Sequence, residues 1–120
     1  MSRVGLGRAG EAQAARFLEA QGYVLLARNW RTRAGELDIV AQEGDALVFV
    51  EVKARRSLLR GLGEESIDAR KRQQLARLAE QFLAAHPELV FHQCRFDVVV
   101  IDYTQRPMQV RLYRNAFDLE

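Results

Sequence analysis

The sequence predicts a single α/β domain over residues 1–120, in which a mixed central sheet of about five strands is flanked by helices. One observation is the order of the predicted elements, which is a helix, three strands, a second helix and two strands. Another is the nearly continuous apolar run 96–101, which is typical of a strand buried on both faces and so requires a layer on each side of the sheet. The length of 120 residues also suits one domain with a real core.

Two helices are predicted from helix-forming residues, apolar periodicity and the residues that end them. The first spans 8–21, with Gly22 in the position of a C-terminal cap, and the second spans 64–85, with Pro87 just beyond its end. The basic, glycine-containing stretch 54–63 predicts a loop before the second helix. Strands are predicted, in chain order, at 23–27, 36–42, 46–53, 96–101 and 108–113, the last alternating as an edge strand does.

The charge composition permits nucleic-acid binding without requiring it. Eighteen lysines and arginines stand against sixteen acids, which gives a formal net charge of +2. Only two of these cations are lysines, Lys53 and Lys71. A lysine kept in such an arginine-rich chain indicates a position that needs a compact ammonium group, which a guanidinium cannot imitate.

The same composition predicts the compartment. No apolar run approaches the roughly 20 residues needed to cross a bilayer, and the N-terminal residues lack the apolar core of a signal peptide. Cys94, the single cysteine, cannot form an internal disulfide and suits a reducing environment. We therefore expect a cytoplasmic protein with no membrane partner.

The clearest local signal is a hairpin formed by the strands 36–42 and 46–53. A two-residue turn at Gly44-Asp45 makes Asp38 face Glu51, whereas a three-residue turn would put these two carboxylates on opposite faces of the sheet. Facing carboxylates repel and indicate a cation between them. That cation is Lys53 or a divalent metal held by Asp38 and Glu51, since hard oxygen ligands suit Mg²⁺ and Mn²⁺. A solvated strand end with no ion is the third interpretation.

The helices add charged residues to this patch. Lys71 lies in the same helical arc as the apolar residues Leu75 and Phe82, so it should face inwards and needs an acidic or phosphate partner. Glu11 shares a face of the first helix with Leu18 and points the same way. Taken alone, Glu11 is a favourable charge near a helix N-terminus. Together, the two lysines and the acids can converge on one site.

Several of these residues carry a resemblance to known proteins. Asp38 followed by Glu51-Val52-Lys53 resembles the Asp…Glu-x-Lys signature of restriction-endonuclease-like nucleases, although Leu37 stands where that signature often has proline. A longer string resembles the YraN-like family of uncharacterised proteins, which is similar to the archaeal Holliday-junction resolvases. The matching residues are Gly10-Glu11 with Ala14, Gly22-Tyr23, Arg28 to Arg31, Gly35 to Val40, Val48 to Lys53, Lys71 and Arg95 to Val99.

The resemblance implies a three-layer restriction-endonuclease-like core and Mg²⁺- or Mn²⁺-dependent hydrolysis of phosphodiester bonds in DNA, with branched or junction DNA as candidate substrates. Asp38 and Glu51 would hold the metal, Glu11 would assist, and Lys53 would orient the nucleophile or stabilise negative charge. Because junction resolution needs two active sites, a homodimer is also implied. Nucleic-acid contacts are expected from Lys71, Gln74, Arg31, Arg33, Arg55, Arg56 and Arg60.

Two other functions fit the same residues: a nucleic-acid-binding module that does not cut, and a protein-interaction domain whose acids and lysines form a structural ion network. Other sites are disfavoured, since His86 and His92 are not spaced as zinc ligands and the chain has no glycine-rich phosphate loop. We expect Trp30 to pack in the core or at its edge, and Asp97 to be a structural partner for an arginine near Arg95.

Overall fold

The computed structural model describes residues 3–56 and 67–117, which form one five-stranded sheet between two helices. The strands lie in the sheet in the order β1-β2-β3-β4-β5, with β3 and β4 parallel and the other neighbours antiparallel. The predicted mixed sheet, with its last strand at an edge, is confirmed. The elements are α1 (Arg3–Ala20), β1 (Val24–Thr32), β2 (Gly35–Glu43), β3 (Ala46–Arg55), α2 (Ala69–Ala85), β4 (Gln93–Asp102) and β5 (Gln109–Phe117).

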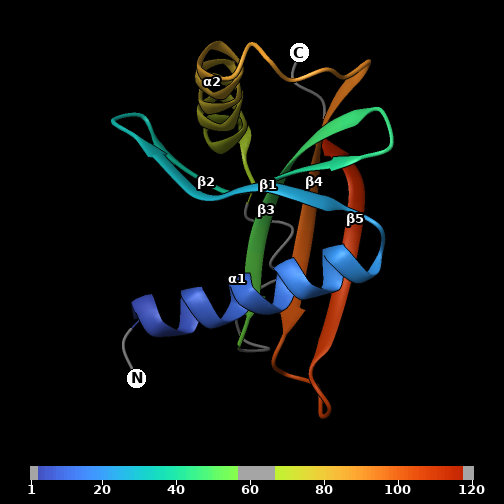
Figure 1. Cartoon of the computed structure of the whole chain (residues 1–120). Coiled ribbons are helices and arrows are strands. Elements are labelled where there is room, and N and C mark those ends of the chain that lie inside the picture. The colour runs from blue at the N-terminus through green and yellow to red at the C-terminus, as the bar shows by residue number, and fades with distance from the viewer. Residues whose placement is uncertain (1–2, 57–66, 118–120) are drawn as a thin grey trace.

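The helices cover opposite faces of the sheet and give the molecule three layers (Figure 1). Under α1, Leu18 packs against an aliphatic cluster that includes Ile39 and Val48. Under α2, Phe82 meets Phe49 edge-on, with ring centroids 6.0 Å apart. Burial of these two apolar surfaces drives the fold, and β3, covered on both faces, forms its centre.

The boundaries of most elements differ from the predicted ones. Helix α1 begins at Arg3 and not at 8, and β4 and β5 are longer than the predicted strands 96–101 and 108–113. Strand β1 continues through the basic stretch 28–32, because Trp30 packs inwards against Phe82, with centroids 5.3 Å apart, while Arg31 points to solvent. The expected packing role of Trp30 is confirmed. The second helix begins at Ala69 and not at 64, because the carboxylate of Asp68 caps it by accepting a hydrogen bond from the Lys71 amide at 2.9 Å. Residues 57–66, which include most of the predicted loop, lie outside the described residues.

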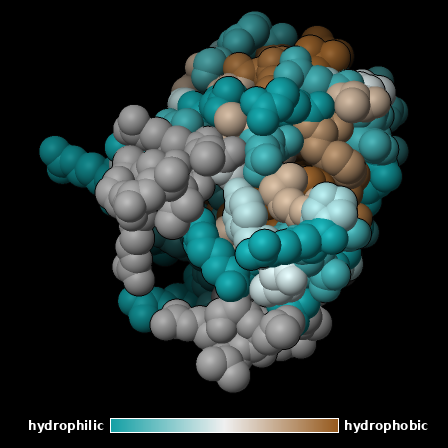
Figure 2. Space-filling model, turned by 90° about the horizontal axis from the view of Figure 1, so that it is seen from below, coloured by the Kyte–Doolittle hydropathy of each residue, from teal (hydrophilic) through white to brown (hydrophobic). Residues whose placement is uncertain are grey.

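On the face seen from below, the described residues are mainly hydrophilic (Figure 2). Seen from below, hydrophobic side chains gather in a band at one side, between polar residues (Figure 2). Among the described residues, the large apolar side chains that are exposed are Val24 and Leu26, two residues apart on β1, and Val90, between α2 and β4. None of the described helices is long and apolar enough to cross a membrane.

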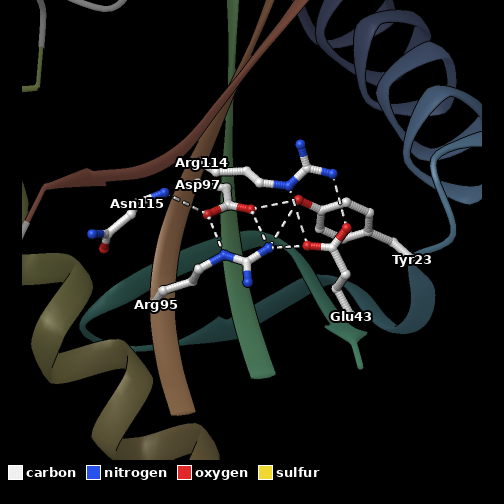
Figure 3. Close-up of polar contacts among 6 residues, drawn as sticks. All are labelled: Tyr23, Glu43, Arg95, Asp97, Arg114 and Asn115. Atoms are coloured by element: carbon white, nitrogen blue, oxygen red, sulfur yellow. Dashed lines mark hydrogen bonds and ion pairs between the residues drawn. The ribbon is translucent and has the colours of Figure 1, made fainter. Parts of the chain in front are cut away.

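A polar network joins segments that are distant in the sequence (Figure 3). Asp97 on β4 is fully buried and accepts hydrogen bonds from the Tyr23 hydroxyl (2.7 Å), the Arg95 guanidinium (3.0 Å) and the Asn115 amide (2.9 Å). Burial and the bond to Asp97 raise the pKa of Tyr23 to about 12. The structural role predicted for Asp97 is confirmed, and its arginine partner is Arg95 itself.

Glu43, the last residue of β2, joins this network to the turn end of the hairpin. Its carboxylate pairs with Arg95 and, at 2.8 Å, with Arg114 on β5. The hydrogen bond from Arg114 and the neighbouring Arg95 lower the pKa of Glu43 to about 2. The network therefore holds the turn end of the β2–β3 hairpin against β4 and β5.

Replacing Asp97 by alanine should lower the free energy of unfolding by about 3–5 kcal/mol, because Arg95 would lose its buried counter-charge. Replacing Arg114, whose side chain is 49% exposed, should cost about 1 kcal/mol or less. Chemical denaturation of both variants measures the difference. Equal losses would show that Asp97 is no more important to the fold than an exposed ion pair.

Candidate functional site

The candidate site lies where β2 and β3 separate. The predicted two-residue turn is confirmed, because the ladder pairs Glu43 with Ala46 and runs in that register to Ile39 and Val50. Gly44 has φ 60°, as the first central residue of a type II′ turn requires. Beyond Ile39 the ladder ends, and the β1–β2 turn reaches out beside α2 while β3 continues alongside β4 (Figure 1). We call the gap between the separating strands the fork.

Asp38 lies at the base of the fork, with its carboxylate directed across it. Its Oδ2 accepts a hydrogen bond from the backbone amide of Val52 at 2.9 Å, in the place of a ladder bond. Asp38 and Glu51 share a side-chain hydrogen bond, so the register brings these two acids together as predicted. Burial and the charge of Asp38 raise the pKa of Glu51 to about 7, and burial also raises the pKa of Asp38.

Two further acids reach Asp38 from other elements. One carboxylate oxygen from each of Glu11, Glu36 and Asp38 lies within 4.8 Å of the other two. Glu11 projects from α1, and burial, followed by the charges of Asp38 and Glu36, raises its pKa. Its Oε2 is buried without a hydrogen-bond partner. Such an all-oxygen donor set with an unsatisfied buried oxygen fits a hard divalent cation such as Mg²⁺ or Mn²⁺.

Both lysines of the chain meet at Glu51. The Nζ of Lys53 lies 3.9 Å and that of Lys71 lies 3.7 Å from Glu51 Oε1. The prediction that Lys71 faces the acids is thereby confirmed. Because Glu11 comes from one helical layer and Lys71 from the other, the site depends on both layers packing on the same sheet.

The lysines open into a pocket of about 670 Å³ on the α2 side. Its lining includes four cations, namely Lys53, Lys71, Arg70 and Arg77, and one acid, Asp68. The acids at the fork are thus bordered by a positive, concave surface. Polyanions are attracted to such a surface by electrostatic steering.

Gln74 lines the pocket beside Lys71 and also makes a structural contact. Its side-chain amide donates to the carbonyl of Ala34 at 2.8 Å, and its Nε2 lies 2.5 Å from where a Cβ on Gly35 would stand. With φ 140°, Gly35 is also in a conformation that L side chains rarely adopt. Gln74 therefore holds the β1–β2 turn against α2, and its contact with a phosphate stays a prediction.

The arginines predicted to contact nucleic acid do not form one surface. Arg31 is 68% exposed and pairs with Glu36 at 3.5 Å, which is its partner in the β1–β2 register. Arg33 is exposed in the adjoining turn. Both lie at the outer end of the fork and stay candidates for backbone contacts.

The second group of arginines lies at the end of β3. Arg55 is mainly buried and pairs with the fully buried Asp102 at 3.5 Å, so its charge stabilises the core and is unsuited to a backbone contact. Arg56 is exposed, with its guanidinium 5.8 Å from the ring centre of Tyr103. Arg60 lies outside the described residues.

Two residues of the site were not assigned a role from the sequence. The sequence did carry a signal for Glu36, since extending the register in which Asp38 faces Glu51 by two residues puts Glu36 opposite Lys53. Asn29 gave no such signal. It lies in β1 opposite Asp38, with φ 54°, and its side chain is close enough to Glu11 to lower the pKa of that carboxyl. Asparagine tolerates this left-handed conformation better than most residues.

Comparison with known proteins establishes the family. Residues 10–101 match the uncharacterised protein family UPF0102. The chain belongs to this family. It is 46% identical over 112 residues to a UPF0102 protein of Stutzerimonas stutzeri, with 93% of each chain covered. It is also 48% identical to a UPF0102 protein of Ectopseudomonas mendocina, with 94% of each covered.

A relative from another organism gives the same result. A UPF0102 protein of Symbiobacterium thermophilum is 47% identical over 116 residues, covering 93% of this chain and 95% of that protein. The predicted resemblance to the YraN-like family is confirmed, since UPF0102 is that family. The UPF0102 names carry no activity, so a function has to be argued from the site.

Metal binding should be coupled to the protonation of Glu51. Because the pKa of Glu51 is raised from 4.5 to about 7, the metal-free native state keeps a proton that the unfolded chain releases, and the free energy of unfolding falls as pH rises between these values. A divalent ion needs the deprotonated carboxylates. Thermal unfolding should therefore show a larger stabilisation by Mn²⁺ at pH 8 than at pH 6.

Glu51→Gln is the matched variant, because an amide can replace the shared proton. It should be less sensitive to pH in this range and lose most of the Mn²⁺ stabilisation. An equal Mn²⁺ effect at both pH values and in Glu51→Gln would place the bound ion elsewhere.

Asn29 should matter to metal affinity through Glu11. Asn29→Gly keeps the left-handed backbone and removes the amide, so Mn²⁺ affinity should fall about tenfold, as for other residues that orient a ligand, with little change in melting temperature. Asn115→Gly is the control, since Asn115 has a similar φ of 51° on β5. Calorimetric titration with Mn²⁺ compares them, and equal affinities would remove Asn29 from the site.

Proposed function

We propose that this protein is a metal-dependent nuclease that hydrolyses phosphodiester bonds in DNA, with Mg²⁺ or Mn²⁺ as cofactor. The observation that carries the proposal is the meeting of acids from α1, β2 and β3 at the fork, with both lysines of the chain on one of these acids and a basic pocket beside them. Phosphodiester hydrolysis needs these parts: an oxygen-ligated cation, an activated water and positive charge at the phosphate.

The acids fit the cation by their chemistry. Asp38 and Glu51 would hold it, with further donor oxygens from Glu36 and from Glu11, whose buried Oε2 has no other partner. When bound, the ion would neutralise the acids and polarise the phosphate. Burial keeps water from screening these charges, which strengthens their interaction with the ion.

The lysines supply the remaining charge. Lys53 lines the pocket next to Glu51, where its ammonium can donate to a phosphate oxygen as negative charge develops there. Lys71 occupies the adjoining part of the lining and would hold the phosphate in place. Because each ammonium is a compact point charge, arginine would not reproduce this arrangement.

The unsatisfied oxygen of Glu11 bears on the alternative functions. A purely structural ion network pairs its buried charges, as the Asp97 network does. At the fork, the unpaired oxygen of Glu11 belongs to a group of three acids within 4.8 Å of one another. These acids repel without a cation, which disfavours the protein-interaction domain. A binding module that does not cut has the same pocket, so cleavage decides between these two.

Lys53→Ala should reduce Mn²⁺-dependent cleavage of DNA by about 10²–10³, since the transition state loses one stabilising ammonium, while DNA affinity changes little. Lys53→Arg keeps the charge and should restore little of the rate. Single-turnover cleavage of linear, nicked, flap and four-way-junction DNA measures this and tests whether branched substrates are preferred. Cutting of junctions should then be accompanied by a dimer in solution, because two strands must be cut.

Wild-type protein that binds DNA but leaves every substrate intact in Mn²⁺ and Mg²⁺ would contradict the nuclease and favour the binding module. Lys53→Ala that cleaves at the wild-type rate would contradict the role of Lys53.

A further inference from the structure

We infer, on the basis of the proposed function, that helix α2 binds the backbone of double-stranded DNA through Arg70 and Arg77 and so guides a duplex arm of the substrate to the fork. These two arginines are separate from the acids and lysines of the proposed active site. They lie on the helix that lines the pocket, and both contribute to its lining.

The spacing of the two arginines fits a backbone. Arg70 and Arg77 are seven residues apart, which is nearly two helical turns, so they share one face of α2. The rise between them is about 10 Å, the length of roughly three base-pair steps along a duplex. Gln73 and Gln74 line the pocket between them. This face can therefore follow several phosphates of one strand.

The charges of both arginines are available to a ligand. Within the described part of the chain, neither Arg70 nor Arg77 has an ion pair, whereas Arg55 and Arg95 each pair with a buried acid. The acid of the pocket, Asp68, is engaged in capping α2 through the Lys71 amide. A polyanion approaching the acids at the fork needs such a positive surface, since it would otherwise be repelled.

The lining also discriminates between double and single strands. Proteins that bind single strands stack bases on aromatic side chains, and none of the described residues that line this pocket is aromatic. Trp30, the tryptophan that could have stacked on a base, packs against Phe82 instead. A duplex, whose bases are already stacked, can be bound through its phosphates alone. Contacts of this kind carry no sequence information.

The experiment measures binding without divalent metal, so that cleavage does not interfere. Fluorescence anisotropy compares a blunt duplex with a single strand of the same sequence. The test variant is Arg70→Gln/Arg77→Gln. The control is Arg16→Gln/Arg72→Gln, which removes the same charge from exposed positions on α1 and on the other flank of α2.

Wild-type protein and the control should bind the duplex more tightly than the single strand. The test variant should lose on the order of tenfold in duplex affinity, and its slope of log K against log salt should flatten by roughly 1.8, or 0.9 for each phosphate that is no longer neutralised. Circular dichroism verifies that the variants fold.

Equal affinities and slopes for the test variant and the control would overturn the inference, as would a wild-type preference for the single strand. Cleavage in Mn²⁺ is scored separately. If the wild-type protein cleaves DNA and Arg70→Gln/Arg77→Gln binds DNA as tightly as wild type, only the proposed α2 surface is overturned. Duplex binding that depends on these arginines, with no cleavage in any metal, overturns only the nuclease.

Discussion

The hydrogen bond from the Val52 amide to the Asp38 carboxylate shapes the site, because it replaces the backbone pairing that would otherwise continue the β2–β3 ladder. If β2 and β3 had kept pairing, their side chains would alternate regularly between the two faces of the sheet. Where the two strands separate, a side chain at the opening can contact residues from both helical layers. The fork therefore lets Asp38 meet Glu11 from the α1 side and Glu51, with Lys71, on the α2 side.

This arrangement has an electrostatic cost. Asp38, Glu51 and Glu11 each lose solvation and repel a neighbour, which explains why all three have raised pKa values. Lys71 and Lys53 offset only part of this repulsion at Glu51. Such a cluster persists because apolar packing on both faces holds the surrounding backbone in place, and a cation would relieve the remaining repulsion.

The two ends of the β2–β3 hairpin show opposite uses of buried charge. At the turn end, Glu43 and Asp97 have arginine partners with good hydrogen-bond geometry, and this network connects β2, β4 and β5. At the fork, the carboxylates of Glu11, Glu36 and Asp38 lie within 4.8 Å of one another and one oxygen of Glu11 has no donor. A well-paired anchor at one end allows an electrostatically strained site at the other, which is why we assign function to the fork and stability to the Asp97 network.

The sequence by itself determined the α/β class, the hairpin register and the inward position of Lys71, because each follows from local periodicity or from the geometry of a short turn. It therefore placed Asp38 beside Glu51. The tertiary structure alone decided that Asn29 contacts Glu11, that Gln74 holds the Ala34 turn, and that Arg55 pairs with Asp102. These contacts join elements far apart in the chain, and their partners depend on how two helical layers pack across a twisted sheet, which no local pattern encodes.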